Sequence, residues 1–196
     1  MITMIYTIKQ EPSNGKDVSF EICDETHPLG HVRYHKKSFE ITFNGLDYTL
    51  TPEEHEESKK QNAYVLSSDD EELGTIYEDF KVHNDLKFNQ LLLGDIEYDL
   101  YAIHFSSRDM ALSLFKADTQ IGQLELERQI EHDHMVDFHI YMTDGDDHQL
   151  ASLIMALYYW KNYVARPQEY QSYKSDEARE YAYSKYDPQF IQMVTK

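Results

Sequence analysis

The chain has 196 residues and a formal net charge of −18, from 36 acidic and 18 basic residues. A chain of this length typically forms one domain with a substantial hydrophobic core. Its negative field repels nucleic acids and anionic lipid headgroups, so we expect no nucleic-acid partner, and membrane contact is disfavoured. The single cysteine, Cys23, excludes an internal disulfide framework and a cysteine-based zinc site. The first residues lack a signal-peptide pattern, and we therefore expect a cytoplasmic protein.

Most of the chain before residue 143 alternates apolar and polar residues, as half-buried strands do. Residues 18–23 (VSFEIC) and 38–43 (SFEITF) are two examples. Asn44-Gly45 is the strongest hairpin signal, and the strand predicted after it covers residues 46–50. The stretch 51–54 (TPEE) resembles a short helix start, although a solvated loop is the preferred interpretation. Altogether the pattern predicts roughly ten to twelve strands.

One short pattern occurs three times in this region. An aliphatic residue is followed by glycine in Leu29-Gly30, Leu73-Gly74 and Ile121-Gly122, at similar spacing along the chain. Such recurrence indicates a strand meander that is repeated around a barrel or sandwich. Chance recurrence in a β-rich chain is the alternative.

The most apolar stretch of the chain covers residues 150–160, in which only Ser152 is clearly polar. It predicts a helix over about 147–164, with Asp146 or Asp147 as the N-cap and Pro167 just beyond its end. A helix that is apolar all round is buried all round, and this one is too short to span a membrane. Losing it should unfold the domain. The side chains predicted to form its core face are Leu150, Leu153, Ile154, Leu157 and Trp160.

The composition changes after Pro167. Residues 167–196 are rich in tyrosine and charge, and Ser175 begins a pattern typical of a capped helix. The apolar end at 190–194 is expected to dock on the domain or on a neighbouring subunit. We therefore divide the chain into a barrel at 1–166 and a partly helical extension at 167–196.

A hydrophobic helix that follows a long strand meander resembles the tubby C-terminal-like superfamily, which includes tubby, the phospholipid scramblases and the LURP-one-related proteins. The resemblance rests on this order, on the glycines Gly30, Gly74 and Gly122, and on the acidic-then-apolar stretch at 147–157; it covers residues 1–165. It implies a mainly β (α+β) fold: a closed antiparallel barrel of roughly twelve strands around a buried C-terminal helix, here with a short helical tail.

The resemblance also implies functions that this chain does not obviously share. Tubby tethers to membrane phosphoinositides, a lipid role is proposed for scramblases, and many bacterial and plant relatives have no established activity. Lys36-Lys37 and Lys59-Lys60 are isolated pairs and do not form a cluster suited to a phosphate headgroup. No binding residues are therefore carried over from the family.

The densest group of ligand-type residues is the stretch 131–139, which contains His132, His134 and His139. On a strand His132 and His134 share a face, so they are candidate metal ligands. A polar hairpin turn is the preferred interpretation.

Other candidate sites are weaker. The stretch 144–147 (DGDD) resembles a calcium loop, but Met155 occupies the position of the glutamate that such a loop requires. Cys23 and His27 are close in sequence, although a buried strand thiol is the better interpretation. No nucleophile elbow, P-loop or dinucleotide-binding motif occurs in the sequence. We therefore assign no catalytic or cofactor-binding residue and expect no cofactor.

These observations favour a non-enzymatic binding or scaffold module. Its partner is expected to be another protein or a second copy of the chain, bound through the tyrosine-rich extension. A lipid-associated module, as in tubby and the scramblases, is the alternative. A metal-dependent hydrolase centred on His132, His134 and His139 is the second alternative.

Overall fold

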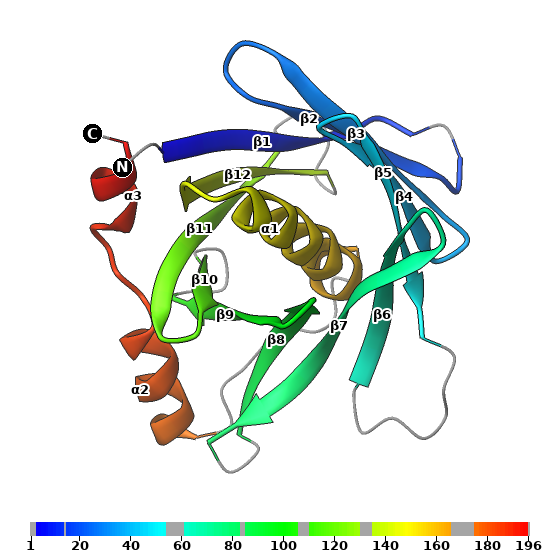
Figure 1. The fold of residues 1–196 in the computed structure, drawn as a ribbon. Helices are drawn as coiled ribbons and strands as arrows, with labels where there is room; N and C mark the ends of the chain where they lie inside the picture. The colour runs from blue at the N-terminus through cyan, green and yellow to red at the C-terminus, as the bar shows by residue number, and fades with distance from the viewer. Residues whose placement is uncertain are drawn as a thin grey trace.

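Twelve antiparallel strands close into a barrel around one helix, as the sequence predicts (Figure 1). The computed structural model describes residues 3–13, 15–53, 61–82, 85–105, 110–129, 135–165 and 175–195. Each strand pairs with the next one in the chain, and β1 closes the barrel against β12. The strands are β1 (Thr3–Glu11), β2 (Val18–Cys23), β3 (Pro28–His35), β4 (Ser38–Phe43), β5 (Leu46–Pro52), β6 (Gln61–Ser68), β7 (Glu71–Lys81), β8 (Leu86–Leu93), β9 (Ile96–His104), β10 (Met110–Lys116), β11 (Thr119–Arg128) and β12 (Val136–Thr143).

Strand alternation sorts the side chains into the barrel interior and its outer face. In β4, Phe39, Ile41 and Phe43 are buried, whereas Glu40 between them is exposed. This period of two turns every second residue toward the central helix. Thr51 and Pro52, where the sequence resembles a helix start, instead continue β5 and pair with β6. Residues 54–60 lie outside the described part.

The repeated aliphatic–glycine pattern corresponds to a repeated β-bulge. The strand register shifts opposite each pair, where Gly30 faces Ile22, Gly74 faces Leu66 and Gly122 faces Leu114. The bulges therefore recur every four strands, at β2–β3, β6–β7 and β10–β11. A bulge leaves one extra residue in a strand, and here the extra residue is the aliphatic one before the glycine.

Two of the three glycines are required by close packing. A Cβ atom at Gly30 would lie 1.9 Å from the carbonyl oxygen of Thr42, and one at Gly74 would lie 2.1 Å from that of Leu92. At Gly122 the nearest atom would be 3.4 Å away, an ordinary contact. The first two copies of the repeat therefore require glycine (the strict copies), whereas the third has room for a Cβ atom (the relaxed copy).

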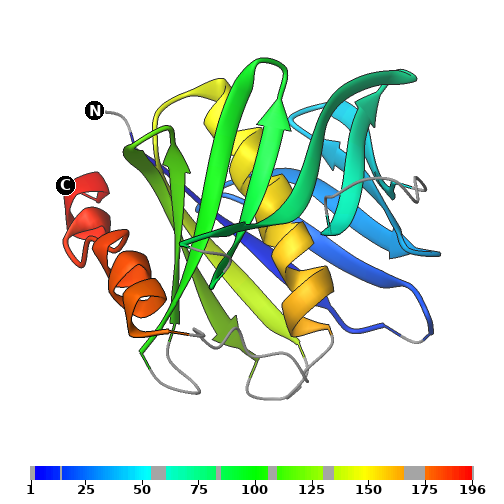
Figure 2. The ribbon, with the colours of Figure 1, turned by 90° about the horizontal axis from the view of Figure 1, so that it is seen from below.

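The buried helix α1 (Asp146–Tyr159) continues as the π-helical turn η1 (Trp160–Val164) and crosses the barrel interior (Figure 2). Four of the five predicted core residues, Leu153, Ile154, Leu157 and Trp160, are buried, but Leu150 is only half-buried because it lies at the start of the helix. The apolar run thus forms the centre of the protein.

The predicted aspartate cap of α1 is wrong. Gly145 is the N-cap, and no side chain caps the helix there. The chain turns sharply from β12 into the barrel at Gly145, with φ of 154°, a conformation that favours glycine. The backbone N–H of His148 then donates to the Gly145 carbonyl, 3.0 Å away.

The C-terminal extension docks on the outside of its own barrel (Figure 1). It contains α2 (Asp176–Ser184), which packs on β8 and β9, and α3 (Phe190–Val194), which packs on β11 and β12. Ser175 caps α2, as predicted, because its Oγ accepts the N–H of Ala178. Ala178 and Ala182 are completely buried, in one cluster with Phe88 and Tyr101. The extension therefore uses its apolar face within the molecule.

Candidate binding surface

The two ends of the barrel differ in what fills them. The α1 end is the end at which α1 begins, and it carries the turns after β2, β4, β6, β8 and β10. The η1 end is the opposite end, at which η1 finishes. Figure 2 shows the helix running from one end to the other.

Apolar side chains reach the surface at the α1 end. We call this set the apolar mouth. Leu46 is 59% exposed, although it pairs with buried Phe43 and therefore occupies an interior position of β5. The other members are half-buried. The apolar mouth consists of Leu29, Leu46, Leu73, Leu93, Ile96 and Leu150.

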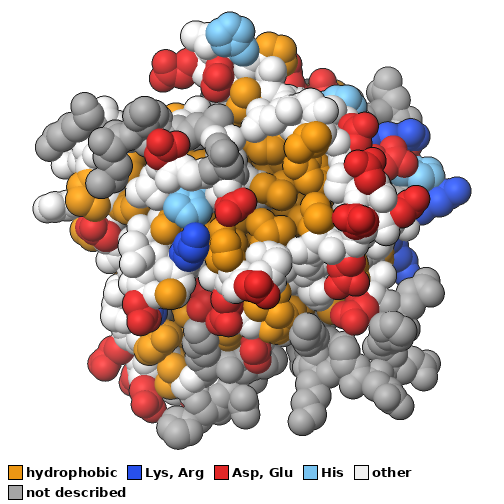
Figure 3. Space-filling view, in the orientation of Figure 1, with side chains coloured by type: hydrophobic (Ala, Val, Ile, Leu, Met, Phe, Trp, Pro, Cys, Tyr) orange, Lys and Arg blue, Asp and Glu red, His pale blue; other side chains and the backbone are white. Residues whose placement is uncertain are grey.

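The path of α1 explains why this surface is open. The backbone of α1 lies closer to β8, β11 and β12 than to β3, β4 and β5. Leu46 follows the Asn44-Gly45 turn on that uncovered side. Figure 3 looks onto the α1 end and shows a hydrophobic patch near its middle, with Asp and Glu side chains around it.

Exposed carboxylates surround the apolar mouth because they lie in the turns at this end or within two residues of them. We call this set the acidic rim. Its members are Glu25, Asp47, Asp69, Asp70, Asp95, Asp118 and Asp144. Among the described residues, none of the side chains of Asp69, Asp95 and Asp118 forms an ion pair within 4.0 Å. The surface therefore combines an apolar centre with a negative border.

A buried tyrosine hydroxyl lies just below this surface. The hydroxyl of Tyr98 has no hydrogen-bond partner among the described residues, and the ring makes an edge contact with His148. Burial, followed by the negative charge of Asp147, raises the pKa of Tyr98 to about 12. The interior polar groups at the α1 end are thus incompletely paired.

The η1 end, in contrast, is filled by an aromatic group. Trp160 meets Phe20 at 5.0 Å and Tyr34 at 5.4 Å between ring centroids, both edge to face. Its indole Nε1–H donates to Oε1 of Gln10 at 3.2 Å, which ties the helix to the first strand. Edge-to-face pairs of this kind add about 0.5–1.5 kcal/mol each beyond area burial.

A buried polar cluster completes the η1 end. Glu78 is 2% exposed, and its Oε1 accepts the hydroxyl of Tyr163 at 2.6 Å and the side-chain amide of Asn62 at 3.0 Å. Lys87 Nζ lies 2.9 Å from the other oxygen, Oε2. Asn89 donates to the same Tyr163 hydroxyl at 3.1 Å. A carboxylate buried in this way must be paired, and here the pairing anchors η1 to β6, β7 and β8.

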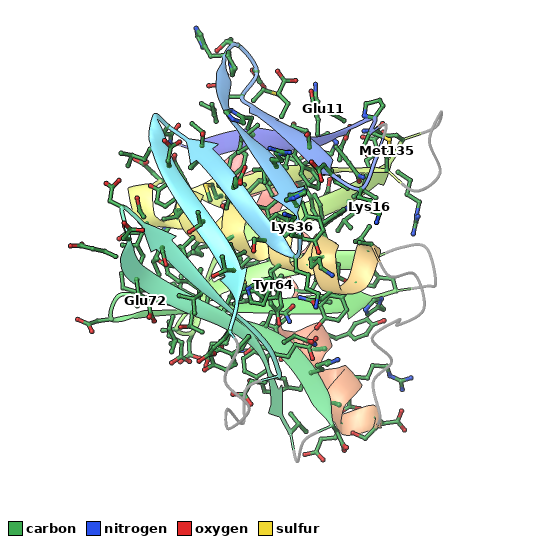
Figure 4. The ribbon with its side chains drawn as sticks, turned by 90° about the vertical axis from the view of Figure 1, so that its right-hand side faces the viewer. Glu11, Lys16, Lys36, Tyr64, Glu72 and Met135 are labelled. Atoms are coloured by element: carbon green, nitrogen blue, oxygen red, sulfur yellow. The ribbon has the colours of Figure 1, made fainter. Side chains whose placement is uncertain are left out.

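The outer face of β2 to β5 contains two neighbouring hollows of about 690 and 660 Å³. Asp17 pairs there with His35 and with Arg33, whose guanidinium is 2.6 Å away. Hydrogen bonds from His35 first, and from Arg33 second, hold the pKa of Asp17 below its usual range. Lys16 and Lys36 lie near these residues, at the opposite end from Glu72 (Figure 4). Because Asp17 and Glu11 also line the first hollow, its charge is mixed.

The histidines singled out in the sequence do not form a site in the described part of the chain. His132 and His134 lie outside the described residues. His139 is on the outer face of β12, where its Nε2 lies 2.9 Å from Oε2 of Glu127. No group of three or more His, Cys, Asp or Glu side chains suited to a metal occurs among the described residues, and this includes Asp144 and Asp147.

Cys23 and His27 flank one turn, in which the backbone N–H of Asp24 donates to the carbonyl oxygen of His27 at 3.1 Å. Cys23 is a half-buried free thiol at the end of β2. The Nδ1 atom of exposed His27 lies 2.6 Å from Oγ1 of Thr26 and 3.9 Å from Oδ1 of Asp24, within the turn. The structure thus ties His27 to the turn itself.

The apolar mouth was missed by sequence reasoning because its residues come from five strands and a helix. One signal was present: Leu46 follows a tight turn directly and is flanked by Gly45 and Asp47, where a solvated residue is usual. Only the barrel brings the turn before Leu46 to Leu29 and to the start of α1, where Asn44 donates to the Leu29 carbonyl at 2.9 Å and to Gln149 Oε1 at 3.0 Å.

Comparisons with known proteins give no match. No family model matches the sequence, and no curated protein or solved structure is detectably similar to it. In the described residues no helix combines the length and hydrophobicity needed to cross a bilayer.

Proposed function

We propose that the chain is a non-enzymatic binding module, and that it docks an apolar segment of a partner protein on the apolar mouth. The observation that supports this proposal most directly is Leu46. It is the most exposed large hydrophobic side chain of the described residues, at 59%, and it follows Asn44, whose backbone N–H donates to the carbonyl oxygen of half-buried Leu29 at 2.9 Å. Contiguous apolar surface with a polar border is typical of interaction sites.

The other exposed hydrophobic side chains favour this surface over the C-terminal extension. Phe105 and Tyr183 contact each other on the outside of the barrel, at 5.7 Å between ring centroids, and Met193 stands on α3. The extension already buries Ala178 and Ala182 against the barrel, which leaves it less apolar surface for self-association.

We also propose that the chain is a distant relative of the tubby C-terminal-like barrels. A closed barrel of twelve strands around an apolar helix supports this assignment. A lipid-associated function would accompany that kinship. The cations at Lys16 and Arg33 share their hollow with Glu11 and Asp17, and this mixture favours a protein ligand over an anionic headgroup.

A random peptide library displayed on phage, selected on the immobilised full chain, tests the binding function. Selected peptides should bind the wild type and lose at least about tenfold in affinity to Leu46→Asp, because one buried leucine contributes about 2 kcal/mol. Met193→Asp is the matched control, since Met193 is 56% exposed and lies on α3. Both variants should keep the wild-type unfolding midpoint.

The proposal fails if no peptide is enriched, or if the enriched peptides bind Leu46→Asp as tightly as the wild type. Loss of affinity in Met193→Asp alone would move the binding surface to the C-terminal extension.

A further inference from the structure

We infer that the segment docked on the apolar mouth is a positively charged amphipathic helix of a partner protein. This inference rests on the proposed function and adds the chemistry of the ligand. Three features of the molecule support it: the acidic rim, the distribution of cations, and the closure of the barrel.

Without a basic ligand, the carboxylates of the acidic rim lie close together with few positive charges near them. Asp69 and Asp70 are adjacent in one turn, and Glu71 and Glu72 follow them, all four exposed. An apolar ligand alone would leave these charges near a desolvated patch. Lysine or arginine side chains at the edge of the ligand would pair with them and still reach water.

The cations of the described chain lie mostly elsewhere. Lys16 and Lys36 are at the η1 end, whereas Glu72 is at the α1 end (Figure 4). Lys116 is half-buried beside the rim, with its Nζ 5.9 Å from the centroid of the Tyr98 ring. The field at the apolar mouth is therefore negative and would attract a basic segment from a distance.

The closed barrel selects the form of the ligand. Each of the twelve described strands pairs with two neighbours, so none of them offers a whole edge to an added β-strand. A helix can instead place two or three apolar side chains of one stripe on the apolar mouth. Its flanking positions then carry the positive charges over Glu25, Asp47 and Asp95, three of the rim carboxylates.

Two fluorescent peptides of about 14 residues test the inference by anisotropy with the full chain. Both carry leucine at the same helical positions, and the remaining positions are lysine in one peptide and glutamate in the other. The lysine peptide should bind, and binding should weaken as salt is raised, because exposed charges are screened within about 10 Å at 0.1 M salt. The glutamate peptide should bind at least about tenfold more weakly.

Charge variants separate the acidic rim from the net charge of the protein. Glu25→Lys/Asp95→Lys should lower affinity for the lysine peptide about tenfold or more. Glu21→Lys/Glu180→Lys changes the net charge equally at exposed positions outside the rim, on β2 and α2, and should change affinity less than about twofold. Leu46→Asp should abolish binding of the lysine peptide.

Several outcomes overturn the inference. Equal losses in the two charge variants would mean that net charge alone attracts the peptide. Binding of the glutamate peptide as tightly as the lysine peptide, with loss in Leu46→Asp, would keep the proposed function but reject a basic ligand. Dimerisation in light scattering that Leu46→Asp abolishes would make a second copy the occupant. Flotation with zwitterionic vesicles that depends on Leu46 would make the occupant a lipid surface.

Discussion

At the η1 end of the barrel Trp160 packs edge to face against Phe20 and Tyr34, and the buried carboxylate of Glu78 forms an ion pair with Lys87. At the α1 end Leu46 stands 59% exposed, and the hydroxyl of Tyr98 has no partner among the described residues. The two ends share the same strands and the same helix. They differ because the helix begins beside β11 and β12 and finishes with its largest side chain in the interior. One end is thus filled by packed side chains, and the other retains exposed apolar surface.

Truncating one apolar side chain at each end should give the largest contrast. Trp160→Ala deletes a buried aromatic group and should lower the free energy of unfolding by about 3–5 kcal/mol. Leu46→Ala removes a mostly exposed side chain and should change it by less than about 0.5 kcal/mol. Urea unfolding of both variants provides the measurement. A large loss in Leu46→Ala would show that the apolar mouth belongs to the folding core.

The bulges at the α1 end can be compared with one another. Gly74→Ala places a Cβ atom 2.1 Å from the carbonyl oxygen of Leu92, so the strands must separate locally. The expected destabilisation is about 3 kcal/mol. Gly122→Ala meets only ordinary contacts and should cost less than about 1 kcal/mol. Thermal unfolding distinguishes them, and equal losses would contradict the difference between the strict and relaxed copies of the repeat.

One tyrosine hydroxyl at each end allows hydrogen bonding at the two ends to be compared. Tyr163→Phe removes the donor to Glu78 and the acceptor of Asn89, and should cost about 1–3 kcal/mol because a buried carboxylate loses a partner. Tyr98→Phe removes a hydroxyl that has no partner among the described residues, and should be neutral or slightly stabilising. Chemical denaturation of both variants gives the comparison. A cost for Tyr98→Phe similar to that of Tyr163→Phe would indicate a bonded hydroxyl at the α1 end.

Alkaline pH should produce the smallest effect. The pKa of Tyr98 is raised by burial from 10.0 to about 12. A raised pKa in the folded state contributes stability that is complete below pH 10 and is lost as pH rises toward 12, because the unfolded chain ionises first. Between pH 10 and pH 12 the free energy of unfolding should therefore fall less steeply with pH in Tyr98→Phe than in the wild type. Identical slopes would argue against a buried, neutral Tyr98.

Local sequence patterns were sufficient for much of the fold. Strict alternation in β4 and the Asn44-Gly45 turn predicted strands, and the apolar run at 150–160 predicted a helix buried on all sides. These signals are local because the period of side-chain burial is set by the backbone geometry of each element. The recurring glycines predicted a repeat, and the structure adds that the repeat is a β-bulge.

The cap of α1 could not be read from composition. Two aspartates before a helix favour a carboxylate cap, but the sharp turn into the barrel selects Gly145 by its backbone conformation. Most of the candidate surface was equally hidden, since its residues come from five strands and a helix that meet only in the barrel.

The sequence by itself determined a barrel of strands around an apolar helix, because hydrophobic periodicity and turn residues act over a few positions. The tertiary structure decided which side of the barrel the helix covers and on which face the C-terminal extension docks. Both depend on packing between segments far apart in the chain, such as Trp160 with Phe20 and Ala178 with Phe88. The open, acid-bordered end of the barrel is the result of that packing.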